Sequence, residues 1–205
     1  FLQAASIRIL GINTAGLRFP SPVISAVTAL LLYLFSRRLF GQLVAILATL
    51  FFATSHYAIH FGRIALNNIW DPFFAVAGLH FLTVGLQEKR VIHSLVGGIV
   101  TGMAIYFYMG ARLVPFIVLA YLIHWAWTER AFVEEHLLQF ALYGLGGLLS
   151  SMPLLTFFAR NPKEMTARWK LVSIFASGWL QSEAEKLSTT RLNLLLRQFQ
   201  KAVLA

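Results

Sequence analysis

The sequence contains no cysteine and few acidic residues. Without a cysteine among its 205 residues, the chain cannot form disulfide bonds, thiolate metal sites or cysteine nucleophiles. Only 8 residues are Asp or Glu, Asp71 is the one aspartate, and charged residues of both signs make up 12% of the chain. Soluble domains usually carry about 25% charged residues. This shortage of charge argues against an ordinary soluble domain.

Apolar residues are correspondingly abundant. They make up 58% of the chain and give it a mean hydropathy of +0.70, so the composition predicts a membrane protein. The net charge of +9 raises nucleic acid as a partner, but the basic residues stand singly or in pairs at the ends of apolar runs and form no stripe. We therefore expect no nucleic-acid partner and favour lipid headgroups or phosphate.

Six apolar runs approach the roughly 20 residues that a helix needs to cross the hydrocarbon core. The segments between them are short, which predicts antiparallel neighbours. Gly98 with Gly102, and Gly144 with Gly147, have the spacing for close helix contacts. The pattern predicts an all-α, polytopic membrane protein with about six transmembrane helices, at residues 21–39, 44–60, 68–86, 92–108, 111–127 and 137–158.

The two ends of the chain differ from this bundle. We expect residues 1–20 to form an interfacial helix and a connecting loop, because residues 1–11 are too few to span the membrane and include polar side chains. Residues 21–159 form the transmembrane bundle, and residues 160–205 an external polar tail ending in an amphipathic helix from about Thr190. The sequence starts at Phe1 and shows no signal peptide, so we expect an internal piece of a longer protein.

The basic residues between the predicted spans suggest an orientation. One set of loops carries more of them than the other set, and we expect the richer set to be cytoplasmic. Loops 56–67 and 108–112 then lie on the outer face of a bacterial-type inner membrane. The richer set holds Arg37, Arg38, Lys89, Arg90 and Arg130, and the poorer set holds Arg18, Arg63 and Arg112.

The stretch HFGRIALNNIWDPFF, residues 60–74, concentrates polar groups between two predicted spans. Asp71 followed by Pro72 is typical of a helix start, with an N-cap and a first-turn proline, and Asn67 and Asn68 suit exposed amides at such a start. A charge near lipid is costly unless it is paired or wet. Arg63 beside Asp71 therefore also marks a candidate anion site or buried ion pair, and both interpretations can hold.

Two further features suggest ligands. Arg112 follows a glycine at the head of a predicted span, where a guanidinium holds a phosphate through paired hydrogen bonds or extends to the interface. His56 and His60 share one helix face, as two metal ligands do, but Tyr57 stands where a zinc protease has its glutamate. We predict no metal site from this pair.

Three motifs in order resemble a known family. The pieces GLRFPSPVISAVTALLLYLFSRRLFG, SHYAIHFGRIALNNIWDPFF and GMAIYFYMGARLVP are similar to the bacterial dolichyl-phosphate-mannose protein mannosyltransferases, membrane glycosyltransferases of the GT-C fold (glycosyltransferase family 39-like). VSIFASGWL and LLLRQ extend the likeness into the tail. The resemblance implies transfer of a sugar from a polyprenyl-phosphate donor to an acceptor on the outer face.

The resemblance also implies a catalytic base that these residues do not supply. Relatives carry an Asp or Asp-Glu in the first external loop, ahead of a surface helix that residues 1–11 resemble, so we expect this motif upstream of Phe1 and assign no catalytic residue. Many relatives have an aspartate where this sequence has Asn68. We predict Arg63 and Arg112 as phosphate or cavity-lining contacts, with the polar residues Asn67, Asn68 and Asp71 shaping the outer mouth.

The remaining predictions concern partners. Lipids and the polyprenyl-phosphate donor are the expected ligands. The residues themselves predict no cofactor. The resemblance leaves open a requirement for a divalent cation. The alternative is a non-catalytic auxiliary subunit that uses the same helical scaffold to pack in a larger membrane complex, because a fold alone does not establish a function.

Overall fold

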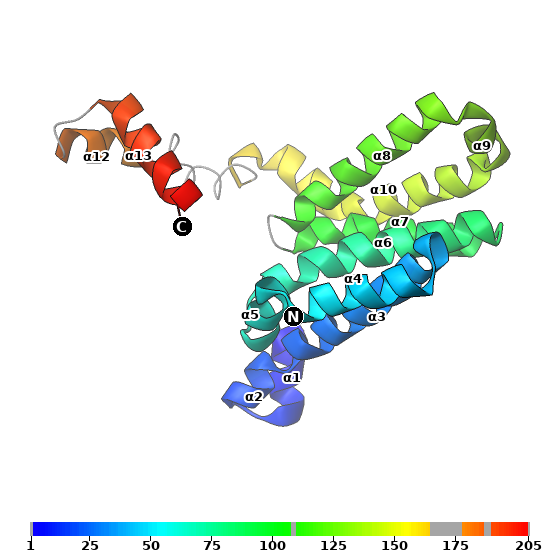
Figure 1. Ribbon diagram of the computed structural model, residues 1–205, viewed down its shortest axis with the longest axis horizontal. Coiled ribbons are helices and arrows are strands. Elements are labelled where there is room, and N and C mark those ends of the chain that lie inside the picture. The colour runs from blue at the N-terminus through cyan, green and yellow to red at the C-terminus, as the bar shows by residue number, and fades with distance from the viewer. Residues whose placement is uncertain (1, 108–109, 165–177, 187–189, 205) are drawn as a thin grey trace. The chain divides into compact units, whose positions relative to one another are not determined.

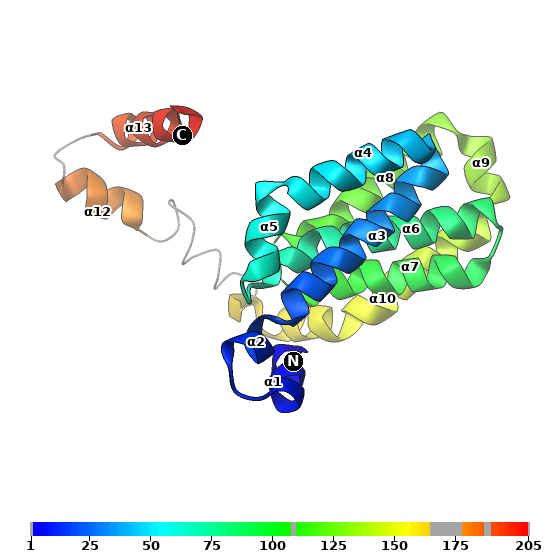
Figure 2. The same cartoon turned by 60° about the horizontal axis from the view of Figure 1, so that its bottom comes forward.

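The computed structural model describes residues 2–107, 110–164, 178–186 and 190–204. Every regular element in these ranges is a helix. The chain divides into two compact units, Phe1–Leu154 and Leu155–Ala205, and each is described by itself. Figures 1 and 2 show the helices of the first unit lying side by side as a bundle.

A pair of short helices precedes the bundle. Helix α1 covers Leu2–Leu10 and α2 covers Thr14–Arg18, and the Asn13 side chain caps α2 by accepting a hydrogen bond from the Gly16 N–H group. Helix α3, Pro20–Phe40, starts with proline at its first position and ends at Gly41, whose φ of +85° suits a residue without a β-carbon.

The second predicted span, residues 44–60, is broken in the structure. Helix α4, Gln42–Thr54, and helix α5, His56–Arg63, meet at Ser55 with a bend of 53°. The backbone of Ser55 is extended, and its hydroxyl accepts a hydrogen bond from the Ala58 N–H group at 3.2 Å. Ser55 thus ends one helix and caps the next, which is why one continuous span does not form.

The middle of the bundle consists of two antiparallel helices. A 3₁₀ turn η1, Asn67–Ile69, leads directly into α6, Trp70–Gln87, and α7 follows at Val91–Met103 with a 3₁₀ turn η2 at Ala104–Tyr106. The predicted span at 92–108 is therefore shorter than expected. Its helical part stops at Met103 and tightens into η2, because 3₁₀ turns often replace the last turn of a helix.

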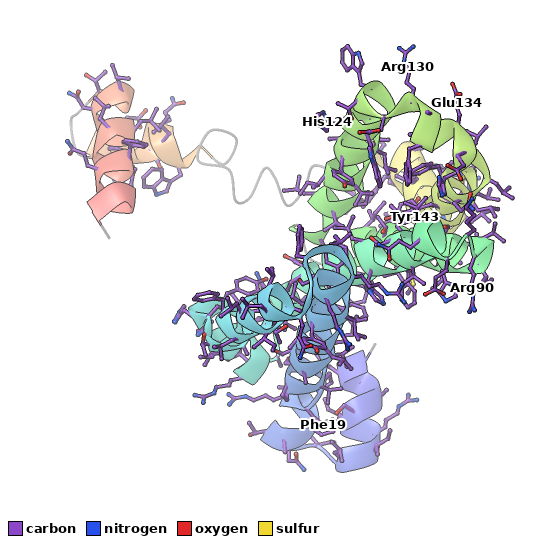
Figure 3. All side chains as sticks on the ribbon, turned by 45° about the vertical axis from the view of Figure 1, so that its right-hand side comes forward. Phe19, Arg90, His124, Arg130, Glu134 and Tyr143 are labelled. Atoms are coloured by element: carbon purple, nitrogen blue, oxygen red, sulfur yellow. The ribbon has the colours of Figure 1, made fainter. Side chains whose placement is uncertain are left out.

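Four further helical elements complete the first unit and lead out of it. They are the 3₁₀ turn η3, Ala111–Leu113, and the helices α8, Val114–Thr128, α9, Arg130–Glu135, and α10, Leu137–Arg160. Helix α8 begins with proline in its first turn. Arg130 and Glu134 of α9 point outward from the bundle (Figure 3).

Four helical stretches among the described residues are long and apolar enough to cross a membrane, or five if the bent α4–α5 pair counts as one span. The chain is thus an all-α polytopic membrane protein, with fewer full spans than the six predicted. The four are residues 14–40, 67–87, 111–128 and 137–160.

Small residues let α7 pack closely against both α6 and α10. A β-carbon at Gly78 of α6 would overlap with the Thr101 hydroxyl of α7, and one at Gly98 of α7 would overlap with the Tyr143 carbonyl oxygen of α10. Gly102 is equally close to Gly147. These contacts confirm the prediction for three of the four glycines. The fourth, Gly144, has no neighbour there within 4 Å.

The bundle has two ends of different character. We call one the Asp71 end, formed by the loop after α5, the start of α6 and η3. The other is the Glu88 end, formed by the α3–α4 turn, the α6–α7 turn and α9, which lie together in both ribbon views (Figures 1 and 2). Successive helices run antiparallel between them, as the short connections predicted.

The second unit contains two described helices that pack together, α12 at Trp179–Lys186 and α13 at Arg191–Leu204. Leu180 and Ala184 of α12 are buried, as is Leu194 of α13. The amphipathic helix predicted from about Thr190 is thus present. The tail residues 165–177 and 187–189, including the VSIFAS part of the resemblance, lie outside the described residues.

Candidate functional site

The loop between α5 and η1 is held from two sides. Its residues Ile64 and Leu66 have extended backbones. The side-chain amide of Gln3 in α1 donates a hydrogen bond to the Ala65 carbonyl oxygen at 2.8 Å, and the Tyr57 hydroxyl donates to the Asn68 carbonyl oxygen. Neither restraint was predicted. Together they hold the loop and the following 3₁₀ turn η1, which carries Asn67 and Asn68.

Asp71 connects two sequence motifs that are about 40 positions apart. Its carboxylate accepts a hydrogen bond from the Ala111 N–H group, and it lies so close to Gly110 that a β-carbon there would overlap with the Oδ2 atom. Its Oδ1 atom is buried and has no hydrogen-bond partner among the described residues. The NNIWDP stretch and the MGAR stretch therefore meet through this carboxylate.

This arrangement corrects the expected role of Asp71 as an N-cap. Helix α6 starts at Trp70, its N-cap is Ile69, and no side chain caps it. Asp71 lies within the first turn, where a negative charge still interacts favourably with the helix dipole. None of the ion pairs among the described residues contains Asp71, so the structure does not support the expected pair with Arg63.

An aromatic cluster supports the same contact. Trp70 lies 4.8 Å from Phe107 between ring centroids, and Phe74 lies 4.6 Å from Phe107. Ala104 and Ala111 are fully buried beside them. Aromatic pairs at these separations add to the stability gained from burial. The start of α6 is thus packed firmly against η2 and η3.

The other predicted polar residues occupy the surface of the Asp71 end. Arg112 is half-buried in η3, immediately after the residue that donates to Asp71. Asn68 is half-buried and Asn67 exposed in η1, whose carbonyl oxygens accept the Trp70 N–H group. These residues are at the same end of the bundle, as predicted from the alternating direction of the spans.

Arg63 lies in a different setting from Asp71. It is exposed at the last turn of α5 and lines a shallow groove of about 310 Å³ between α3, α4 and α5. Pro22 and Ser25 of α3 and Gly62 of α5 line the same groove. The structure thus places the two predicted phosphate-binding arginines at one end of the bundle but in separate local environments.

Metal binding finds no support in the described part of the chain. No three His, Asp or Glu side chains gather there in a group that could hold a metal ion. His56 and His60 are exposed and stack face to face, with centroids 5.5 Å apart and ring planes 18° apart. Parallel rings do not direct their nitrogen lone pairs at one point.

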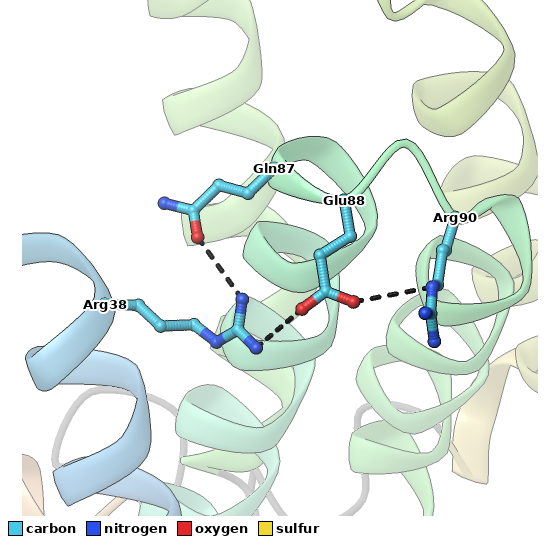
Figure 4. A network of polar contacts seen from close by, with 4 residues as sticks. All are labelled: Arg38, Gln87, Glu88 and Arg90. Carbon is cyan, nitrogen blue, oxygen red and sulfur yellow. Dashed lines mark hydrogen bonds and ion pairs between the residues drawn. The ribbon is translucent and has the colours of Figure 1, made fainter.

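Charges at the Glu88 end pair with one another across the loops. Glu88 accepts from Arg38 at 2.7 Å and lies 3.5 Å from Arg90 (Figure 4), and Lys89 bridges to Glu135 at 2.7 Å. The hydrogen bond from Arg38 is the main cause that lowers the pKa of Glu88. The hydrogen bond from Lys89 likewise lowers the pKa of Glu135.

Comparison with known proteins identifies the family. No curated protein and no solved structure is similar enough to match the chain. The family model described as dolichyl-phosphate-mannose-protein mannosyltransferase matches residues 1–157, which include the Asp71 end and both of the motifs that meet there. The chain therefore belongs to the dolichyl-phosphate-mannose-protein mannosyltransferase family of GT-C-type membrane glycosyltransferases.

Proposed function

We propose that this chain transfers a sugar from a polyprenyl-phosphate donor to an acceptor, and that the Asp71 end receives the phosphate of the donor. In this proposal the Asp71 end faces the outer side of a bacterial inner membrane. Family membership supports the general reaction. The choice of donor, the side of the membrane and the residues involved are the new part of the proposal.

The contact between Asp71 and the Gly110–Ala111 segment carries the proposal. The carboxylate accepts from the Ala111 N–H group and packs on Gly110, so it fixes the backbone immediately before Arg112. A phosphate-binding arginine needs a defined direction, because the guanidinium forms paired hydrogen bonds in a planar fork. Asp71 is therefore a positioning residue for Arg112.

Sugar transfer from a phosphate donor needs stabilisation of the leaving phosphate. Negative charge develops on that phosphate as the sugar–oxygen bond breaks, and fixed cations stabilise it more in a poorly hydrated site than in water. Arg112 is half-buried and Arg63 exposed at the same end of the bundle. We assign Arg112 to the phosphate and Arg63 to the surrounding mouth, with Asn67 and Asn68 offering polar contacts to the sugar or acceptor.

The test measures transfer from a polyprenyl-phosphate sugar by the full protein in membranes. We expect Arg112→Ala to lower the rate by about 10²–10³-fold, the loss seen when one preorganised transition-state contact is removed. Arg63→Ala should lower it less. Arg18→Ala is the matched control, because Arg18 is an exposed arginine in α2 that the proposal leaves without a role.

Two results would contradict the site assignment. Near-normal transfer by both Arg63→Ala and Arg112→Ala would show that neither arginine contacts the phosphate of the donor. Absence of transfer by the wild-type protein with every donor lipid, together with fixed-stoichiometry copurification of other membrane subunits, would favour the auxiliary-subunit alternative. Membrane insertion of each variant, checked by protease protection, separates loss of chemistry from loss of folding.

A further inference from the structure

A second cavity lies in the other half of the bundle. It has a volume of about 540 Å³ and lies between α3, α6, α8 and α9, within the range of small-molecule sites, about 300–1,000 Å³. Its wall on α6 runs from Leu79 to Gln87. It begins eight residues beyond Asp71, about 12 Å along the helix, and extends towards the Glu88 end.

The wall of this cavity is almost entirely apolar. Phe35 and Leu39 of α3 line one side, and Ile117, Tyr121 and Trp125 of α8 line the other. The hydroxyl of the lining residue Thr83 donates to the Leu79 carbonyl oxygen at 2.9 Å, so it is already satisfied within its own helix. A hydrocarbon chain fits such a wall because it leaves no polar group unpaired.

The polar groups of the cavity lie at its Glu88 end. The lining residue Gln87 accepts a hydrogen bond from Arg38 Nη1 at 3.4 Å, and Arg38 Nη2 binds Glu88 at 2.7 Å (Figure 4). Arg38 and Arg90 share the one carboxylate of Glu88, so this cluster has a net positive charge. Arg38 retains 36% side-chain exposure and has further N–H donors.

We propose that this cavity binds an anionic phospholipid, with one acyl chain between α3, α6 and α8 and the phosphate at Arg38. The cavity is bordered by helices long enough to span the membrane. It therefore lies among the acyl chains of the lipid leaflet at the Glu88 end, which are present at high concentration. The positive cluster at its mouth favours a negative headgroup. A lipid whose headgroup lies at the Asp71 end would have to extend its chain through about half the length of the bundle before the chain reached the cavity.

The test compares phospholipid retention by the full chain purified in mild detergent. We titrate phosphatidylglycerol and phosphatidylcholine and count bound lipids by native mass spectrometry. For wild type we expect one tightly bound phosphatidylglycerol and weaker binding of phosphatidylcholine. Ile117→Trp should fill the cavity and lower the affinity for both lipids. Ile92→Trp is its control, since Ile92 is 58% and Ile117 64% exposed, and Ile92 does not line the cavity.

Arginine variants test the headgroup contact separately. Arg38→Gln should weaken phosphatidylglycerol binding about tenfold, the loss expected for a charge-assisted hydrogen-bonding group, and should leave phosphatidylcholine binding nearly unchanged. Arg37→Gln is the matched control, because Arg37 is the adjacent exposed arginine and lies about 100° around the helix from Arg38.

Three outcomes would overturn the proposal. The first is equal lipid binding by Ile117→Trp and Ile92→Trp. The second is that the wild-type protein retains a polyprenyl phosphate in preference to phosphatidylglycerol and that Ile117→Trp abolishes this preference. That result would assign the cavity to the tail of the sugar donor. The third is cross-linking of a second copy or another membrane protein to position 117 in native membranes, which would show that a helix covers the cavity.

Discussion

The two ends of the bundle handle charge in opposite ways. The Glu88 end carries five basic residues and four glutamates in the sequence, and the structure joins several of them in ion pairs across loops. The Asp71 end has a single acid, and its carboxylate accepts a backbone N–H group. One end uses charge to tie helices together. The other end uses its only carboxylate to fix the backbone before an arginine.

This difference bears on which end performs chemistry. Exposed ion pairs contribute little to stability and are screened by salt, so losing one of them should change little. A half-buried carboxylate that holds a backbone segment has no close substitute. An arginine that directly follows such a fixed segment is held in a defined direction, which paired hydrogen bonds to a phosphate require. The comparison therefore favours the Asp71 end for binding a phosphate, and the following predictions test it.

The largest effect is expected for Asp71→Ala. The Ala111 N–H group would lose its acceptor, which costs about 1–3 kcal/mol of unfolding free energy for a buried donor, and sugar transfer should fall with it because Arg112 is released. Asp71→Asn keeps an acceptor and should retain most of the stability. Chemical unfolding in detergent, combined with the transfer assay, measures both. An Asp71→Ala protein as stable as wild type would remove the basis of the comparison.

A somewhat smaller effect is expected for Gly110→Ala. The new methyl group would overlap with the Asp71 carboxylate, and such overpacking costs about 1–3 kcal/mol. Gly144→Ala is the control, because no atom lies within 4 Å of a β-carbon there and alanine favours a helix interior. We expect transfer to fall in the first variant and thermal stability to be unchanged or higher in the second.

At the Glu88 end, Glu88→Gln should have only a small effect. It removes the ion pairs with Arg38 and Arg90, which are exposed to solvent. The loss of Tm should be well below that of Asp71→Ala, and transfer should stay near wild type. A Glu88→Gln protein that is destabilised as much as Asp71→Ala would show that the two ends do not differ in the way described.

The smallest effect is a pH dependence. The pKa values of Glu88 and Glu135 are lowered in the folded protein by Arg38 and Lys89. Their contribution to stability is therefore complete above the ordinary glutamate value of 4.5 and is lost as the pH falls below it. Tm measured between pH 7 and pH 3 should show a step that shrinks in a Glu88→Gln/Glu135→Gln protein.

The sequence predicted the long helices well and their interruptions poorly. Residues 111–127 and 137–158 form apolar helices within a few residues of the predicted limits, because a long apolar run leaves the backbone few alternatives in lipid. The break at Ser55 was missed, since serine is common within membrane helices. Its capping bond to Ala58 depends on a local choice of backbone angles that composition does not reveal.

For the candidate site, the sequence predicted the neighbourhood but not the contacts. Alternating span directions were enough to bring Asp71 and Arg112 to one end. The contact of Asp71 with Gly110 and the tie from Gln3 to Ala65 arise from tertiary packing, which a single sequence does not encode in a readable pattern. Gly110, two positions before Arg112, was the available signal, because glycine often marks a close approach.

The shortness of α7 has a consequence for the surrounding lipid. Val91–Tyr106 is a helical stretch of fewer than 18 residues, and 16 residues rise only about 24 Å, against a hydrocarbon thickness of about 30 Å. Such hydrophobic mismatch is relieved by local thinning of the bilayer. Water and headgroups should therefore reach deeper beside η2 than beside α10.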